Sequence, residues 1–374
     1  MGGGNVTLGE IAGVRIAVNW SWIVVFALIV WTLAGSVFPD QNPGLSDVTY
    51  GWMAVAGAIL FFGSILLHEL GHALQARRDG MEIDGITLWL FGGVASFRGM
   101  FPSAAAELRI AAAGPLVSLA LGAAFLLVAG LLPLPEAVDG VAAWLGYTNL
   151  VLLVFNLIPA LPLDGGRMLR AALWLVRGDF SRATIAAAAI GRAIAYLLIG
   201  TGLALLVFSG ALGGAWLAFI GWFLLQAAGA EARHLATREA LGGLRVRDLM
   251  VRAPVTVPVD FSVGRFMDDV ASSERYTTYP VVDDGRPVGL LAFRCVASVP
   301  RGEWDRRSIR DCMIPRDQVP TLREDEEAAE ALAELGSSDV HRGFVLDDGS
   351  LVGFLSITDL ARALEVRPRR RRAR

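Results

Sequence analysis

Long apolar runs fill the first two thirds of the chain, and shorter alternations of apolar and polar positions fill the last third. A helix that crosses a bilayer needs about 20 mostly apolar residues, and six runs are long enough. They cover roughly residues 20–38, 52–75, 104–132, 141–158, 184–208 and 216–230. The pattern predicts a multi-span α-helical membrane protein with about six transmembrane helices, followed by a C-terminal α/β domain.

Arginine is distributed unevenly among the loops that join these runs. The loops at residues 39–51, 133–140 and 209–215 contain none, whereas the alternate loops and the segment after the last run contain several. Because basic loops remain on the cytoplasmic side of a membrane, both termini and the soluble domain are predicted to face the cytoplasm. The expected location is the cell membrane, with several passes.

Two shorter segments of the membrane part have β character. Residues 6–18 mix apolar and polar side chains around Gly13 and resemble a small amphipathic hairpin. Residues 82–98 are rich in β-forming residues, with Gly92 and Gly93 in the middle. That composition predicts a sheet or a re-entrant hairpin at the cytoplasmic interface.

The soluble part contains an internal repeat. VRDLM at residues 246–250 recurs as IRDCM at 309–313, a shift of 309 − 246 = 63, and DDG at 283–285 recurs at 347–349, a shift of 64. Each copy is predicted to run from a short β segment through a helix to a β-hairpin and a closing helix. The predicted division is a membrane domain (1–232), a linker (233–244), a repeated domain (245–366, with copies 245–299 and 308–366) and a basic tail (367–374).

Composition narrows the function classes. The chain has 374 residues, 54% hydrophobic and 18% charged, which is too apolar for a soluble enzyme of this length. Its net charge is −3, and no basic face lies outside the C-terminal tail, so no nucleic-acid partner is expected. Cys295 and Cys312 are the only cysteines, which excludes a disulfide framework and a cysteine zinc site.

The second apolar run carries the chemistry. His68-Glu69-Leu-Gly-His72 has the spacing H-E-x-x-H, and positions i and i+4 share one face of a helix, so both imidazoles reach one ion. Glu69 lies about 100° around the helix, close enough to contact a water on that ion. The division of roles is that of a metalloprotease: His68 and His72 bind zinc, and Glu69 is the general base.

Two imidazoles and a water leave a tetrahedral zinc ion one protein ligand short. The best candidate is Asp164, since Pro159 and Pro162 cannot continue the fourth helix and Gly165 and the following glycine allow a bend. Broken backbone at membrane depth is tolerated where it lines a polar cavity. The alternative is that Asp164 caps a helix, and Glu107 and Asp84 are weaker rivals.

These paired motifs resemble the site-2 protease family of intramembrane zinc metalloproteases. The resemblance rests on HELGH at 68–72 and on N-x-x-P-x-x-P-L-D-G-G-R at 156–167. It implies one Zn²⁺ per chain and a substrate or oxyanion role for Asn156. The family's third-helix motif matches Gly114 and Ser118, for which helix packing is the alternative.

The segment with Gly92 and Gly93 resembles the strand on which that family receives unfolded substrate by β-augmentation. A plain surface hairpin is the alternative. The implied partners are membrane-anchored proteins, for example anti-sigma factors or remnant signal peptides, and the implied process is regulated intramembrane proteolysis.

The repeat resembles a tandem pair of cystathionine-β-synthase (CBS) domains. In that family the second hairpin ends in Gly-h-h-Ser/Thr-x-x-Asp, which holds the ribose of an adenosine-containing ligand. The second copy fits with Ser356 and Asp359, whereas the first has Ala292 and Cys295 at these positions. One adenine-nucleotide site is therefore implied, and a scaffold or a homodimer through the CBS domains without a ligand is the alternative.

Two other functions are compatible with parts of this pattern. A transporter or channel gated by the CBS pair also has broken helices and intramembrane carboxylates, although no inverted repeat is visible. A proteolytically inactive sensor is disfavoured because all four chemical residues are present. The favoured hypothesis is an intramembrane zinc metalloprotease modulated through its CBS pair.

Overall fold

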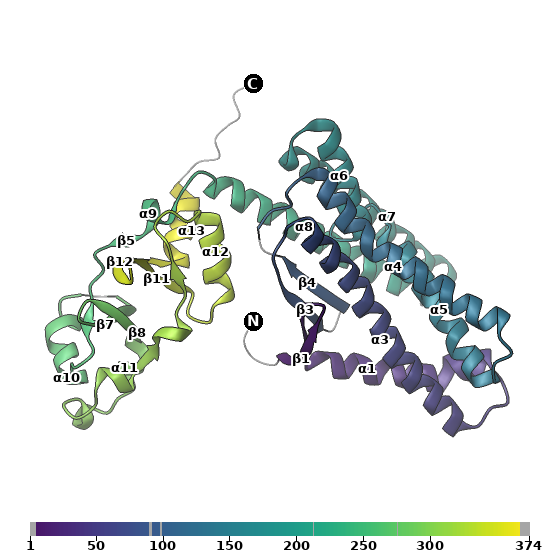
Figure 1. The fold of residues 1–374 in the computed structure, drawn as a ribbon, viewed down its shortest axis with the longest axis horizontal. Helices are drawn as coiled ribbons and strands as arrows, with labels where there is room; N and C mark the ends of the chain where they lie inside the picture. Colours follow the sequence, from purple (N-terminus) through teal and green to yellow (C-terminus); the bar gives the residue numbers. More distant parts are fainter. Residues whose placement is uncertain (1–4, 90–91, 98, 212, 275, 367–374) are drawn as a thin grey trace. The chain divides into compact units, whose positions relative to one another are not determined.

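The computed structural model describes residues 5–366 apart from 90–91, 98, 212 and 275. The chain divides into two compact units, of which the first contains Gly3–Leu235 and the second contains Ala236–Arg374. Figure 1 shows the first as a set of long helices with a small sheet and the second as two small sheets with short helices.

Six helices of the first unit are long and apolar enough to cross a membrane, as predicted from the sequence. The multi-span α-helical architecture is thus confirmed. The spans are α1 to α2 (Ser21–Gln41, which includes a π-turn at Leu33–Val37), α3 (Asp47–Arg78), α4 (Ala104–Leu131), α5 (Glu136–Asn156), α7 (Phe180–Ser209) and the first part of α8 (Gly213–Leu241), Gly213–Ala230.

Polar caps set the starts of three of these helices. Ser46 accepts a hydrogen bond from the backbone N–H of Thr49 at the start of α3, and Ser103 does the same for Ala106 at the start of α4. Asp179 caps α7. Because these first turns contain polar residues, α3 and α7 begin earlier than their apolar runs indicated.

A short helix, α6 (Asp164–Arg177), follows the break in the fourth span. The α5 helix ends at Asn156, residues 157–163 form turns that include Pro159 and Pro162, and α6 then begins at Asp164. The turns lie very close to α6: a Cβ on Gly165 would be 2.3 Å from the carbonyl oxygen of Leu157. Glycine is required there because backbone occupies the space of a side chain.

One four-stranded sheet belongs to the membrane unit, in the order β1-β2-β3-β4. The predicted N-terminal hairpin is formed by β1 (Asn5–Ile11) and β2 (Val14–Asn19), and the predicted second hairpin by β3 (Ile83–Trp89) and β4 (Gly92–Phe97). A parallel pairing of β2 with β3 joins the two hairpins. In this order β4 is an edge strand that pairs only with β3 in the described residues.

The last two spans pack through glycines. A Cβ on Gly202 of α7 would be 2.5 Å from the backbone N of Ala218 of α8, and a Cβ on Gly214 of α8 would be 2.4 Å from the carbonyl oxygen of Gly202. Small residues let membrane helices approach closely where the hydrophobic effect gives no drive for association. The α7–α8 pair therefore depends on the absence of side chains at these positions.

The second unit contains the two predicted repeats. Its first sheet has the order β6-β7-β8-β9 and its second the order β10-β11-β12-β5. The strands are β5 (Val251–Arg252), β6 (Val257–Pro258), β7 (Thr278–Asp283), β8 (Arg286–Ala292), β9 (Met313–Pro315), β10 (Thr321–Leu322), β11 (Arg342–Asp347) and β12 (Ser350–Ser356). The helices are α9 (Val246–Leu249), α10 (Val263–Phe266, continued by a π-turn), α11 (Phe293–Ala297), α12 (Ala328–Ser337) and α13 (Ile357–Val366).

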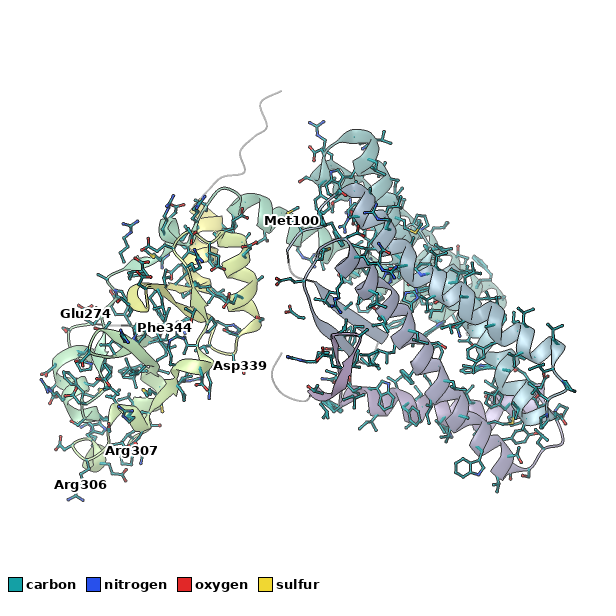
Figure 2. The ribbon with its side chains drawn as sticks, in the orientation of Figure 1. Met100, Glu274, Arg306, Arg307, Asp339 and Phe344 are labelled. Carbon is teal, nitrogen blue, oxygen red and sulfur yellow. The ribbon has the colours of Figure 1, made fainter. Side chains whose placement is uncertain are left out.

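The two copies exchange strands. β5, at the start of the first copy, pairs with β12 of the second, and β9, at the start of the second copy, pairs with β8 of the first. The repeated methionines follow the same exchange: Met250 lies against Gly353, and Met313 lies against Gly289. Phe344, labelled in Figure 2, lies in an apolar cluster with Leu290 of the other copy. The copies therefore share one folding unit.

A candidate metal centre and active site

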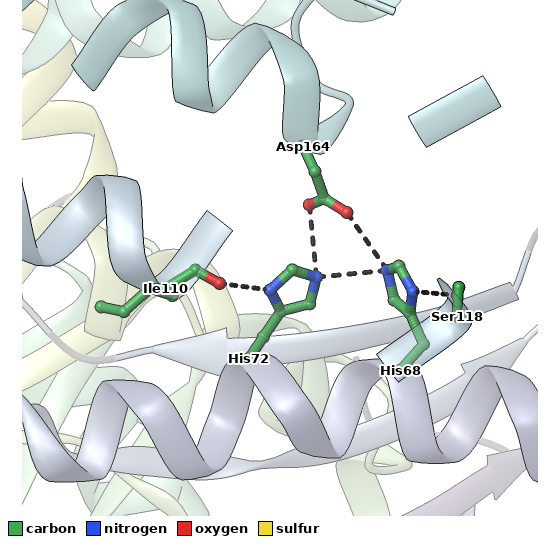
Figure 3. Close-up of polar contacts among 5 residues, drawn as sticks. All are labelled: His68, His72, Ile110, Ser118 and Asp164. Carbon is green, nitrogen blue, oxygen red and sulfur yellow. Dashed lines mark hydrogen bonds and ion pairs between the residues drawn. The ribbon is translucent and has the colours of Figure 1, made fainter. Parts of the chain in front are cut away.

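His68 and His72 are buried on one face of α3, each with 4% of its surface exposed. Their Nε2 atoms are 3.2 Å apart, as the spacing of four residues predicts for a helix. Figure 3 shows both rings directed toward Asp164.

Asp164, the first residue of α6, supplies the third group. One of its carboxylate oxygens lies 3.1 Å from Nε2 of His68, and the other lies 3.3 Å from Nε2 of His72. His68, His72 and Asp164 form a buried group in which one ligand atom from each residue lies within 4.8 Å of the others. The structure thus brings together the three residues that the sequence indicated, whereas Glu107 and Asp84 are outside this group.

Each ring has a hydrogen-bond partner on the side away from Asp164, and for His72 that partner determines which nitrogen carries the proton. Nδ1 of His72 lies 2.7 Å from the carbonyl oxygen of Ile110, which only accepts, so Nδ1 donates. Nδ1 of His68 lies 2.8 Å from the Ser118 hydroxyl. With Nδ1 protonated, a neutral imidazole presents the Nε2 lone pair. The Nε2 lone pairs of the two histidines and the Asp164 carboxylate then face one another with no hydrogen atoms between them, an arrangement that binds a cation.

The separations test whether zinc fits this group. Four ligands at about 2.0–2.1 Å from a tetrahedral zinc ion lie about 3.3 Å from one another. The two Nε2 atoms are 3.2 Å apart, which matches this separation, and each faces a different oxygen of the Asp164 carboxylate, at 3.1 Å for His68 and 3.3 Å for His72. Two histidines and one carboxylate are also a typical catalytic zinc set, which leaves one position open. The residues present therefore fit the ion.

Gly114 of α4 forms the wall of this site. A Cβ at Gly114 would lie 2.2 Å from Nε2 of His72 and 2.6 Å from Nε2 of His68. No side chain can occupy that space while both rings keep their positions. The third-helix motif that the sequence singled out thus lies against the site, with Gly114 leaving space and Ser118 bonded to His68.

Glu69 lies between the histidines in sequence and faces β4. A Cβ on Gly93 would lie 2.5 Å from Cγ of Glu69, so the backbone of β4 passes directly beside this side chain. Gly92 and Gly93 pair with Trp89 and Leu88 across the β3–β4 hairpin. The edge strand and the expected general base are therefore neighbours.

Asn156, for which the resemblance implies a substrate or oxyanion role, is not one of the three grouped ligand residues. It is the half-buried last residue of α5, and no hydrogen bond or ion pair among the described residues joins it to His68, His72 or Asp164. Sequence reasoning also missed two contributors. Any residue offers a carbonyl, so the sequence gives no signal for Ile110, and Arg170 is one of several arginines between the fourth and fifth apolar runs.

Ser356 and Asp359 lie together in the second unit. The Ser356 hydroxyl donates to a carboxylate oxygen of Asp359 at 2.6 Å, and the backbone N–H of Asp359 donates to the Ser356 hydroxyl at 3.3 Å. This reciprocal contact caps α13. Both residues also line a cavity of about 360 Å³, together with Arg342 and Arg362.

Comparisons with known proteins agree with this architecture. The model of peptidase family M50 matches residues 56–136 and 133–199, and the CBS domain model matches residues 246–299 and 309–366. The protein Rip3 of Mycobacterium tuberculosis is 41% identical over 369 residues, covering 96% of this chain and 93% of that protein. A zinc metalloprotease of Methanocaldococcus jannaschii is 31% identical over 362 residues, covering 97% and 96%.

A solved site-2 protease structure from the same archaeon is 32% identical, covering 61% of this chain and 95% of that one, with a TM-score of 0.43. The fold and site define a membrane metalloprotease with a CBS pair. The chain belongs to peptidase family M50, the site-2 proteases. The resemblance and the expected enzyme class, a zinc metalloprotease, are confirmed, and the transporter alternative is set aside.

Proposed function

We propose that this protein cleaves peptide bonds in or near transmembrane segments of membrane-anchored proteins, at one zinc ion held by His68, His72 and Asp164. The observation that carries the proposal is the convergence of these three buried groups, with one ligand atom from each within 4.8 Å of the others, beside Glu69 and an edge strand. A hydrolytic centre inside a membrane unit is accessible chiefly to substrates of that membrane.

The residues of the site have separate roles in the proposed reaction. Zinc, when bound, polarises the scissile carbonyl and lowers the pKa of water. Glu69 takes the proton of the attacking water and gives it to the leaving amide nitrogen. Ser118 and the Ile110 carbonyl hold the two imidazoles in their orientation, since each bonds the Nδ1 that does not face Asp164.

The edge of β4 is the proposed substrate platform. A peptide must be extended for its carbonyl to approach the site, and an edge strand supplies unpaired backbone groups for such a segment. The contact between Gly93 and Glu69 puts that edge beside the general base. A substrate helix therefore unwinds onto β4 before cleavage. Asn156, at the end of α5, is proposed to contact that segment rather than the metal.

Cleavage assays with matched variants test the proposal. The full chain is co-expressed with tagged single-span proteins, including anti-sigma factors and remnant signal peptides. Glu69→Gln keeps the shape of the side chain and removes its basicity, so we expect cleavage to fall at least about 10²-fold with one zinc retained per chain. Cleavage at the wild-type rate in Glu69→Gln contradicts the mechanism.

The ligand assignment has its own measurement. Metal analysis of the purified protein should find one zinc per chain in the wild type and in Glu69→Gln. His72→Ala and Asp164→Ala should each purify with well under one zinc per chain, because the loss of a ligand weakens zinc binding. A variant that keeps a full zinc ion without one of these ligands contradicts the assignment.

The second unit is proposed to be cytoplasmic and to bind one adenosine-containing ligand. Asp359 would hold the ribose, and Arg342 and Arg362, which line the same cavity, would face phosphate groups. Titration of the full chain with ATP and AMP tests this, and binding unchanged in Asp359→Ala contradicts it. Chemical labelling of the loops on intact cells tests the side of the membrane, and light scattering tests dimerisation through this unit.

A further inference from the structure

A buried ion pair joins α4 to α6, outside the metal cluster. Nε of Arg170 lies 2.7 Å and Nη2 lies 2.5 Å from the same carboxylate oxygen of Glu107. Glu107 is 1% exposed and Arg170 is 3% exposed. Charges removed from water to this degree persist only when they are paired, so the two helices are tied at this point.

Aromatic rings surround the same guanidinium. The Arg170 Cζ atom lies 5.0 Å from the ring centre of Phe180, the first residue of α7, and 6.0 Å from that of Phe101, between β4 and α4. Such cation–π contacts are stabilising where water is excluded. One side chain of α6 thus contacts α4, α7 and the segment that leads from the edge strand.

Glu107 belongs to the face of α4 that builds the site. The spacings between Glu107, Ile110, Gly114 and Ser118 are three, four and four residues, which place all four on one side of a helix. The last three contact His72, both Nε2 atoms and His68. The same stripe that orients the histidines of α3 therefore also holds α6, which begins at the third ligand.

We propose that Glu107 and Arg170 are positioning residues that fix α6 on α4 so that the Asp164 carboxylate reaches both histidines. Asp164 stands at the start of α6, after turns that contain no regular structure, so the turns alone do not determine its place. The Glu107–Arg170 contact lies six residues further along the same short helix. This inference rests on the proposed metal site and adds residues that do not touch the ion.

The test measures zinc affinity of the full chain, by competition with a chelator, in Glu107→Met/Arg170→Met. Replacing both partners by apolar residues removes both charges of the pair, so the variant is expected to fold. We expect zinc affinity to fall about 10- to 100-fold and the visible absorption of the cobalt-substituted protein to change. Affinity within about twofold of the wild type overturns the proposal.

A double-mutant cycle that combines the Glu107/Arg170 replacement with Asp164→Ala distinguishes a positioning role from a general effect on stability. If the Glu107–Arg170 pair acts through Asp164, replacing the pair in the Asp164→Ala protein should change the zinc affinity by less than about twofold. An equal loss in both backgrounds overturns the proposal. Asp79→Asn/Arg109→Gln is the matched control, because that ion pair joins the residue after α3 to α4 and Arg109 is exposed. Its zinc affinity should equal that of the wild type.

Arg170→Lys is a second variant for the same zinc-affinity measurement, to be used if the double variant does not fold. Lysine retains the charge but cannot present two N–H groups to one carboxylate oxygen. We expect a folded protein with at least about tenfold weaker zinc binding, and wild-type affinity overturns the proposal. Absence of zinc binding or cleavage in the wild type would instead refute the proposed function itself.

Discussion

Gly114 is the residue at which the smallest change has the largest expected effect. Alanine there would place a methyl carbon 2.2 Å from Nε2 of His72, where the ion and its ligands meet. We expect Gly114→Ala to lose zinc and activity while the protein remains folded, which metal analysis and cleavage assays measure. Gly130→Ala on the same helix is the control, because nothing lies within 4 Å of its Cβ position. Full zinc content in Gly114→Ala contradicts the site geometry.

Gly93 tests the neighbouring general base independently of the metal. Its added Cβ would lie 2.5 Å from Cγ of Glu69, so the carboxylate must move while the histidines do not. Gly93→Ala should therefore reduce the cleavage rate at least about tenfold with one zinc retained. Gly63→Ala in α3 has open space and should cleave normally. Loss of zinc from Gly93→Ala would show that the strand supports the ligands instead.

Residue by residue, the sequence predicted those groups whose chemistry depends on type and spacing. His68 and His72 follow from helical periodicity, and Asp164 follows from the prolines and glycines around it. The sequence could not reveal that Ile110 contributes a carbonyl, because every residue has one. It also ranked Glu107 as a rival ligand, whereas the structure pairs it with Arg170; a charge in an apolar run does not indicate its partner.

Among the elements, α7 and α8 depend on close backbone approach. A Cβ on Gly202 would lie 2.5 Å from the backbone N of Ala218, and backbone cannot move aside as a side chain does. We expect Gly202→Val to destabilise the membrane unit by about 1–3 kcal/mol, seen as a lower unfolding temperature in detergent. Gly200→Val has nothing within 4 Å of its Cβ position and is the control. Equal unfolding temperatures for the two variants contradict the packing described.

The membrane-spanning helices were predictable from the sequence, whereas the pairing of distant strands was not. Six spans and the break before α6 were predictable because a bilayer demands length and proline ends a helix. The joining of the two hairpins was not, since β2 and β3 pair Ile16 with Ile86 across 70 residues of chain. Pairing between strands so far apart in the sequence depends on how both pack against α3, and the local sequence pattern of either strand does not reveal that packing.

For the molecule as a whole, the exchanged strands make the two CBS copies differ in how well they accommodate a side chain at the repeated glycine, Gly289 or Gly353. A Cβ on Gly289 would lie 2.7 Å from the carbonyl oxygen of Ile314, in addition to the Met313 side chain, whereas the atoms nearest to a Cβ on Gly353 belong to the Met250 side chain. Methionine adapts and backbone does not. We expect Gly289→Ala to lower the unfolding temperature of the second unit more than Gly353→Ala does. The opposite order contradicts the exchange.

The repeat predicted two copies and their element order, but not this exchange. Val251–Arg252 and Met313–Pro315 are two and three residues long, too short for alternation to identify their partners. Repetition reveals that copies exist, and only the packed structure shows which copy completes which sheet.

The exchanged strands also order events during synthesis. Val251–Arg252 emerges from the ribosome early, but its partner begins at Ser350, which is 350 − 252 = 98 residues later. At about 5–20 residues per second, β5 waits about 5–20 s for its partner strand. A ribosome that stalls within this interval leaves a finished membrane unit attached to a strand without its partner, which proteases and chaperones recognise.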